Sequence, residues 1–207
     1  MMEFDHLVIA AEELAAGVRW VETVLGVNLQ PGGRHEMFGT HNALLSLGPS
    51  AYLEVISVDP GAPIPDRPRW YGLDHFSGPP RLTHWVLRTD DINKSLASMH
   101  PGVGMPVAVT RANFRWQMAV PQSGLLPYDD MHPAVISWDG PHPAAHLPDA
   151  GIRLQTLHIS HPKAEQWGKA LSLKDSNINF ENQNKDLTAL LTTPSGTMKL
   201  SSNCQES

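Results

Sequence analysis

The chain has 207 residues, of which 41% are hydrophobic, so it can bury a substantial core in one domain or two closely packed subdomains. Its 15 lysines and arginines against 21 aspartates and glutamates give a net charge of −6, and the basic residues form no cluster along the chain. Nucleic acid is therefore not an expected partner, because phosphate binding needs a concentrated cationic surface.

The use of cysteine and the apolar segments indicate a cytoplasmic protein. The single cysteine, Cys204, lies in a polar C-terminal tail, so no internal disulfide can form. The N-terminus is acidic, has no apolar stretch of signal-peptide length, and no segment approaches the length needed to cross a membrane. We therefore expect a cytoplasmic location and no membrane partner.

The first predicted module occupies residues 1–58 and opens with an apolar strand at 4–10. A helix follows, because apolar side chains recur every three or four positions and Gly26 suits the C-terminal cap. The apolar helix residues are Leu14, Val18, Val21 and Leu25. Two more apolar runs, 41–47 and 51–57, are joined by Gly-Pro-Ser, which predicts a hairpin.

A proline-rich linker at 59–81 leads to a second module at 82–140, which repeats the order of strand, helix and strands. Asp90 can cap the helix that follows the opening strand. From 107 to 120 apolar and polar side chains alternate, which is typical of a half-buried strand, and a turn within the run is compatible with the pattern. The module ends in a strand at 134–138.

After a second linker at 141–152, residues 153–201 are interpreted as a third, shorter β-α-β module. Its opening strand at 153–160 precedes a helix that begins at Pro162, a favoured first helical residue. Its closing strands are predicted at 177–181, 186–192 and 197–201. The polar tail at 202–207 is expected to be disordered.

One short sequence segment occurs twice, as EVISVD beginning at Glu54 and as AVISWD beginning at Ala134. Each copy closes a segment that opens with a histidine in an apolar strand, His6 in the first and His84 in the second. A repeat of this kind indicates a duplicated module. The two copies differ in their chemistry, since a carboxylate in the first corresponds to an alanine in the second.

The residues DHLVI at 5–9, Leu-Gly at 25–26 and YLEV at 52–55 resemble the vicinal oxygen chelate superfamily. GTHNALL at 39–45 and RPRW at 67–70 look more specifically like its glyoxalase-like branch of bacterial proteins. The resemblance implies an α+β fold of repeated βαβββ modules, two of them paired into a cleft, with the shorter third module in addition. This superfamily hosts lyases, isomerases, ring-cleaving dioxygenases and metal-free antibiotic-binding proteins, so the fold alone selects no reaction.

The family fold places the first and last strands of each module side by side, so the resemblance implies that His6 and Glu54 converge in the cleft. His84 would enter from the second module by pseudo-symmetry. Two imidazoles and a carboxylate suit a divalent metal such as Zn, Fe, Mn or Ni and leave positions open for substrate. Glu54 is then both a ligand and the candidate catalytic residue. Because Ala134 removes the fourth ligand of the glyoxalase-type pattern, the predicted set is closer in type to that of the ring-cleaving dioxygenases.

Other interpretations of these residues stay open. His6 and Glu54 can form a buried hydrogen-bonded pair or bind a ligand without metal, and His84 can be an ordinary core histidine. His41 and Asn42 precede an apolar strand, where they either orient a substrate or cap the loop.

Arg115 and Gln117 share the polar face of the alternating run. They are candidates to line the cleft and to bind an anionic group of the substrate, although a solvated sheet face would have the same pattern.

Three functions are compatible with these observations. The first is a metal-dependent lyase, isomerase or dioxygenase that acts on a small oxygenated organic substrate. The second is a metal-free protein that binds or sequesters a small molecule in the same cleft, and the third is an interaction module. The apolar sheet face of the third module must be covered, either by another part of the chain or by a second copy of the protein in a symmetric homodimer. A homodimer is therefore also expected.

Overall fold

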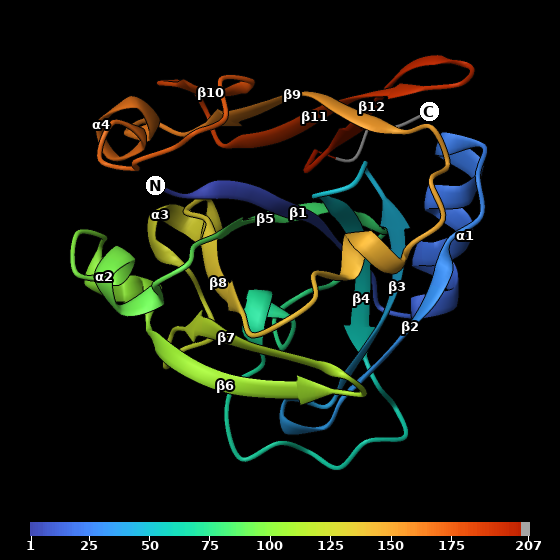
Figure 1. Cartoon of the computed structure of the whole chain (residues 1–207), viewed down its shortest axis with the longest axis horizontal. Coiled ribbons are helices and arrows are strands. Elements are labelled where there is room, and N and C mark those ends of the chain that lie inside the picture. The colour runs from blue at the N-terminus through green and yellow to red at the C-terminus, as the bar shows by residue number, and fades with distance from the viewer. Residues whose placement is uncertain (204–207) are drawn as a thin grey trace.

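The computed structural model of the protein describes residues 1–203 (Figure 1). Its strands form one eight-stranded sheet in the order β2-β3-β4-β1-β5-β8-β7-β6 and one four-stranded sheet in the order β10-β9-β11-β12. Residues 204–207, where most of the disordered tail was predicted and where Cys204 occurs, lie outside the described residues.

The large sheet is built from β1 (Glu3–Ala10), β2 (Gln30–His35), β3 (Thr40–Ser46), β4 (Tyr52–Val58), β5 (Arg81–Arg88), β6 (Met105–Arg111), β7 (Phe114–Val120) and β8 (Ala134–Trp138). The small sheet consists of β9 (Arg153–Ser160), β10 (Ile178–Glu181), β11 (Asp186–Thr193) and β12 (Gly196–Ser201). The helices are α1 (Leu14–Leu25), α2 (Ile92–Leu96), α3 (Pro127–Asp130) and α4 (Ala164–Gly168). Short 3-10 turns are η1 (Glu36–Phe38), η2 (Trp70–Gly72), η3 (Pro101–Val103) and η4 (Pro143–His146).

The large sheet confirms the duplicated architecture. Its first half has the strand order β2-β3-β4-β1 and its second half the mirrored order β5-β8-β7-β6, so β1 and β5 meet as antiparallel neighbours in the middle. In each half the first strand lies parallel to the last, as β1 does to β4 and β5 to β8. The sheet curls (Figure 1), which brings residues of its two ends to opposite sides of one chamber.

The strand β2 was absent from the sequence prediction. Its residues include Pro31, Gly32 and Gly33, which are poor strand formers in isolation. The strand exists because it pairs antiparallel with β3, and its register shifts between Pro31 and Arg34. Tertiary pairing therefore overrides local propensity at this edge.

The third segment follows the predicted order of strand, helix and three strands, but its strand order differs from that of the other two modules. Here β9 lies between β10 and β11 rather than beside the last strand. This sheet covers the outer side of the large sheet (Figure 1), where the fully buried Trp85 of β5 lies 6.0 Å from Phe180 of β10 between ring centres. Its apolar face is covered within the chain, so the argument for a homodimer from an uncovered face loses its basis, and the homodimer stays a prediction.

None of the helices within residues 1–203 is long and apolar enough to cross a membrane. The longest, α1, ends at Gly26, whose left-handed backbone (φ 68°) caps it as predicted. It packs so closely on β4 that a Cβ on Gly17 would lie 2.6 Å from Val55.

Candidate functional site

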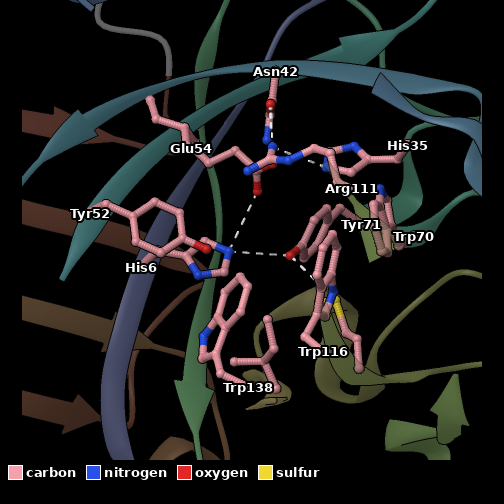
Figure 2. A pocket seen from close by; sticks show the side chains of 13 residues that line it. His6, His35, Asn42, Tyr52, Glu54, Trp70, Tyr71, Arg111, Trp116 and Trp138 are labelled. Carbon is pink, nitrogen blue, oxygen red and sulfur yellow. Dashed lines mark hydrogen bonds and ion pairs between the residues drawn. The ribbon is translucent and has the colours of Figure 1, made fainter. Parts of the chain in front are cut away.

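The concave side of the large sheet encloses a small chamber lined by 13 residues (Figure 2). Its free volume is about 20 Å³, which is room for about one water molecule. The polar lining is concentrated on the first module and the apolar lining on the second. The lining residues are His6, His35, Asn42, Leu44, Tyr52, Glu54, Trp70, Tyr71, Arg111, Trp116, Met118, Ile136 and Trp138.

His6 and Glu54 lie together in this chamber. Parallel pairing of β1 with β4 sets His6 beside Tyr52 and Val8 beside Glu54, so the two functional side chains are diagonal neighbours on one face. His6 Nε2 is 3.5 Å from Glu54 Oε2 (Figure 2), and both residues are buried. The ring of Tyr52 stacks on His6 with 4.4 Å between ring centres, which fixes the plane of the imidazole.

A bulge in β1 brings Asp5 to the same histidine. Along the β1–β5 ladder the register moves from Phe4 directly to His6, so Asp5 is an extra residue without a partner on β5. Asp5 Oδ1 accepts a 2.5 Å hydrogen bond from His6 Nδ1. Its Oδ2 accepts 2.9 Å hydrogen bonds from Trp138 Nε1 and His142 Nε2. A fully buried carboxylate with three donors therefore orients the imidazole and leaves its Nε2 directed into the chamber (Figure 2).

A second chain of hydrogen bonds holds Glu54. Asn42 Nδ2 donates to Glu54 Oε1 at 2.6 Å, and Asn42 Oδ1 accepts from Arg111 Nη1 at 2.7 Å. The backbone N–H of Gly33 donates to the same amide oxygen at 2.8 Å. Arg111 comes from β6 at the far edge of the sheet, so the curl of the sheet connects its two ends across the chamber.

The family model of the glyoxalase-like domain matches residues 4–173. The chain belongs to the glyoxalase-like domain family. A hypothetical protein from Staphylococcus aureus has a solved structure similar to this glyoxalase-like protein, with a TM-score of 0.60, 15% identity, and coverage of 89% of this chain and 88% of that one. A methylmalonyl-CoA epimerase from Mycobacterium tuberculosis is similar at a TM-score of 0.43 and 19% identity, over 69% of this chain and 91% of that one. The chain matches none of the curated proteins.

The contacts of this glyoxalase-like site determine its charges. Burial lowers the pKa of His6, but hydrogen bonds to Asp5 and Glu54 outweigh it and raise the pKa to about 9. Burial raises the pKa of Glu54, but the hydrogen bond and charge of His6 outweigh it and lower the pKa to about 2. The pKa of Asp5 is also held well below its ordinary value, because hydrogen bonds from His142 and His6 outweigh burial. At neutral pH the site therefore holds an imidazolium between two carboxylates.

The structure separates His84 from the other two predicted metal ligands. His84 faces a different cavity, where its Nε2 is 3.7 Å from Asp130 Oδ1. Tyr71 stands between the two sites, since its hydroxyl is 3.4 Å from His6 Nε2 and its ring centre is 5.2 Å from that of His84. The predicted convergence of His6, Glu54 and His84 on one point is therefore not observed.

This arrangement does not fit a catalytic metal of the predicted kind. Such an ion takes three protein ligands, whereas only His6 and Glu54 come together in the chamber. The other imidazole of the lining, His35, is engaged by Thr40 and Arg111. The second-module wall consists of Arg111, Trp116, Met118, Ile136 and Trp138. Within residues 1–203 no group of three or more His, Cys, Asp or Glu side chains could hold a metal ion. A metal would also have to displace the proton that the raised pKa of His6 keeps on its imidazole.

Of the four predicted substrate-binding residues, one lines the chamber and three lie outside it. Asn42 lines the chamber, whereas its neighbour His41 lies on the opposite face of β3 and is partly exposed. Arg115 and Gln117 are exposed and are not among the residues that line the chamber. The alternation of the strand was interpreted correctly, and the polar face belongs to solvent.

Sequence reasoning missed Arg111 because this residue lies four positions before Arg115, so strict alternation from 107 to 120 puts both on the same polar face. A two-residue turn at Ala112 and Asn113 interrupts the run, and Arg111 pairs directly with Phe114 across the hairpin. Paired residues share a face, so Arg111 joins the side chains of Trp116 and Met118. The positive φ of Ala112 (50°) carries no signal in the sequence, since alanine rarely adopts it.

Proposed function

We propose that this glyoxalase-like protein is an enzyme that moves a proton at a carbon next to a carbonyl group in a small oxygenated substrate, as an isomerase or lyase. The observation that carries the proposal is the buried pair of His6 Nε2 and Glu54 Oε2, 3.5 Å apart and directed into the same chamber. A fixed acid beside a fixed base is the arrangement that enolisation needs.

The proposed reaction begins with the substrate carbonyl oxygen near His6 and its neighbouring C–H bond near Glu54. Glu54 Oε2 takes the proton, the C–H electron pair forms a C=C bond, and the carbonyl π pair moves to the oxygen. His6 Nε2 donates its proton to that oxygen and so neutralises the developing charge. When water returns a proton to the opposite face and the enol O–H proton goes back to His6, the carbon is inverted. In an α-hydroxy carbonyl substrate, protonation of the former carbonyl carbon with loss of the proton of the second hydroxyl gives the isomer. With a β-leaving group, the enol O–H proton returns to His6 as the carbonyl re-forms, the leaving group departs with its bonding pair, and the product is that of a lyase.

The two ionised groups support each other in this step. The low pKa of Glu54 depends on the hydrogen bond and charge of His6. Once His6 gives up its proton, that charge disappears and Glu54 becomes a stronger base as it receives the proton from carbon. Asp5 keeps Nδ1 protonated throughout, so that Nε2 is the nitrogen that exchanges protons.

A metal-dependent reaction was the first hypothesis from the sequence. It would use His6 and Glu54 as ligands, with His84 moved from its present cavity to complete the set. The proton-transfer reaction uses His6 and Glu54 in their present positions and leaves His84 where it is, so that the chamber needs only to widen for the reacting carbons, and we therefore prefer it.

A metal-free binding protein is the second candidate. The aromatic wall formed by Tyr52, Trp70, Trp116 and Trp138 favours it, because flat apolar side chains bind aromatic ligands without any chemistry. Such a protein would bind a ligand reversibly and exchange none of its carbon-bound hydrogens.

Solvent deuterium exchange distinguishes the two candidates. Dihydroxyacetone, acetoin and pyruvate are incubated with the protein in D₂O, and loss of their C–H signals is followed by proton NMR. We expect exchange with wild type and at least a ~100-fold slower exchange with Glu54→Gln, which keeps the side-chain shape but removes the base. The control is Glu165→Gln on the exposed side of α4. Equal exchange rates in wild type and Glu54→Gln would contradict the proposal.

A further inference from the structure

A second, larger cavity adjoins the chamber on its outer side. It has a volume of about 680 Å³ and shares two lining residues, Leu44 and Arg111, with the chamber. Cavities of this size hold small organic ligands, whereas the inner chamber has room for about one water. Arg111 and Leu44 therefore form the partition between a binding-sized cavity and the proposed reacting groups.

Arg111 is a guanidinium that has no acidic partner among the residues that the structure describes. No carboxylate of residues 1–203 lies within 4.0 Å of it, although it is only partly exposed. Its Nη1 donates to Asn42 and lies 3.4 Å from His35 Nε2, which leaves the Nε–Nη2 edge without a protein partner in the described part of the chain. Burial lowers the pKa of His35 to about 4, so this imidazole is neutral and does not compete as a cation.

The backbone around Arg111 is shaped to receive it. A Cβ on Gly33 would lie 2.8 Å from Arg111 Cδ, and a Cβ on Gly32 would lie 2.0 Å from Asn42 Oδ1. These two glycines of β2 therefore leave the space in which Arg111 and Asn42 meet. The ring of Phe114 lies 5.8 Å from the Arg111 guanidinium carbon and supports it from one side.

The rest of the outer cavity combines apolar and polar surface. Pro31, Leu44, Phe114, Pro143 and Leu147 provide apolar walls. Arg34 also lines the cavity, but its Nε is 3.1 Å from Asp59 Oδ2, so this cation is already paired. Glu36 adds one exposed carboxylate. Of the two arginines of this cavity, Arg111 is therefore the one that has no carboxylate partner within residues 1–203.

We propose that the outer cavity is the binding site of an organic carboxylate with an apolar body, whose carboxylate pairs with the free edge of Arg111. A guanidinium edge matches a carboxylate through two parallel hydrogen bonds, and the apolar walls accommodate the remainder of the molecule. As an assignment of substrate class, this inference rests on the proposed function. The bound carboxylate lies next to the hydrogen bonds through which Asn42 joins Arg111 to Glu54.

Calorimetric titration tests the site with phenylacetate, its neutral analogue phenylacetamide, and inorganic phosphate. We expect phenylacetate to bind wild type at least about tenfold more tightly than phenylacetamide, since a charged hydrogen bond contributes about that factor. Arg111→Gln should lose the same factor, whereas the matched control Arg115→Gln, an exposed arginine of β7, should leave the affinity within about twofold.

Several outcomes would overturn the inference. Equal affinity for phenylacetate and phenylacetamide in wild type does so without any variant, even if Arg111→Gln fails to fold. The inference is also overturned if Arg111→Gln binds phenylacetate as tightly as wild type does. It is overturned as well if the protein binds inorganic phosphate but not phenylacetate. Failure of the proposed function can be told apart from failure of this site. If phenylacetate binds as expected but wild type and Glu54→Gln exchange deuterium equally, the binding site is supported and the proposed chemistry is contradicted.

Discussion

Asp5 and His6 are consecutive residues of β1, yet their side chains form a 2.5 Å hydrogen bond in the core. Consecutive residues of a regular strand point to opposite faces, so the contact depends on the bulge that leaves Asp5 without a partner on β5. The bulge converts an ordinary Asp-His dipeptide into a carboxylate–imidazole pair. It thereby determines both the orientation of His6 and its charge.

Replacement of this carboxylate by an amide should lower the pKa of His6. Asp5→Asn keeps the shape but removes the negative charge that raises the pKa to about 9, so we expect His6 to be neutral at a lower pH than in wild type. NMR titration of the His6 Cε1–H signal measures the change, with Asp90→Asn as an exposed control. An unchanged His6 titration in Asp5→Asn would show that Asp5 does not set its charge.

The sequence predicted much of the fold but only part of the site. The repeated segment indicated the duplicated modules, and the spacing of apolar residues indicated α1. Such spacing can be recognised in a sequence because it follows from which side chains are buried. The convergence of His6 and Glu54 followed from the implied pairing of β1 with β4. Asp5 and Arg111 could not be assigned in this way, since a bulge and a two-residue turn each reverse the face that strict alternation predicts.

Tyr71 shows a different limit of sequence reasoning. It lies in the proline-rich linker at 59–81, where no periodicity predicts a direction for its side chain. Its backbone is left-handed (φ 57°), and its hydroxyl reaches both His6 Nε2 and the sulfur of Met118. Only the tertiary structure places this ring between His6 and His84.

The stability of the protein should fall as the pH rises from about 6.5 to 9. The pKa of His6 is raised in the folded state, so the stabilisation by its imidazolium is complete below its ordinary value of 6.5 and is lost as the pH passes about 9. A shift of this size corresponds to up to about 3 kcal/mol in the free energy of unfolding. Urea unfolding at several pH values measures it.

A matched pair of variants isolates this effect. His6→Gln should remove most of the loss of stability between pH 6.5 and 9, whereas His35→Gln should retain it. The pKa of His35 is lowered to about 4, so its contribution changes only as the pH falls below 6.5. A wild-type stability that stays constant from pH 6.5 to 9 would contradict the assigned charge of His6.

Zinc should stabilise the protein only weakly at neutral pH. His6 carries a proton, which a metal would have to displace. His84 lies in another cavity, so Tyr71 would have to move before His6, Glu54 and His84 could bind the same ion. Thermal unfolding with and without ZnCl₂ measures the stabilisation, and metal analysis of untagged protein measures its content. One equivalent of bound metal that His84→Ala removes would contradict this expectation.

Gly32→Ala should disturb the link between Arg111 and Glu54. The new Cβ would lie 2.0 Å from Asn42 Oδ1, so Asn42 must move and lose its hydrogen bonds with Gly33 and Arg111. We expect a cost of about 1–3 kcal/mol in the free energy of unfolding, as for other overpacked sites. The pKa of Glu54 should rise, because the hydrogen bond from Asn42 helps to lower it.

Gly61→Ala is the matched control for this substitution, since its Cβ would meet Asp59 Oδ1 at 3.4 Å, an ordinary contact. Chemical unfolding of both variants measures the cost, and titration with phenylacetate measures whether the anion site persists. If Gly32→Ala is as stable as Gly61→Ala and binds phenylacetate like wild type, then Asn42 does not hold Arg111 and Glu54 in one connected unit. A loss in Gly32→Ala alone would place the geometry of both proposed sites under the control of this one glycine.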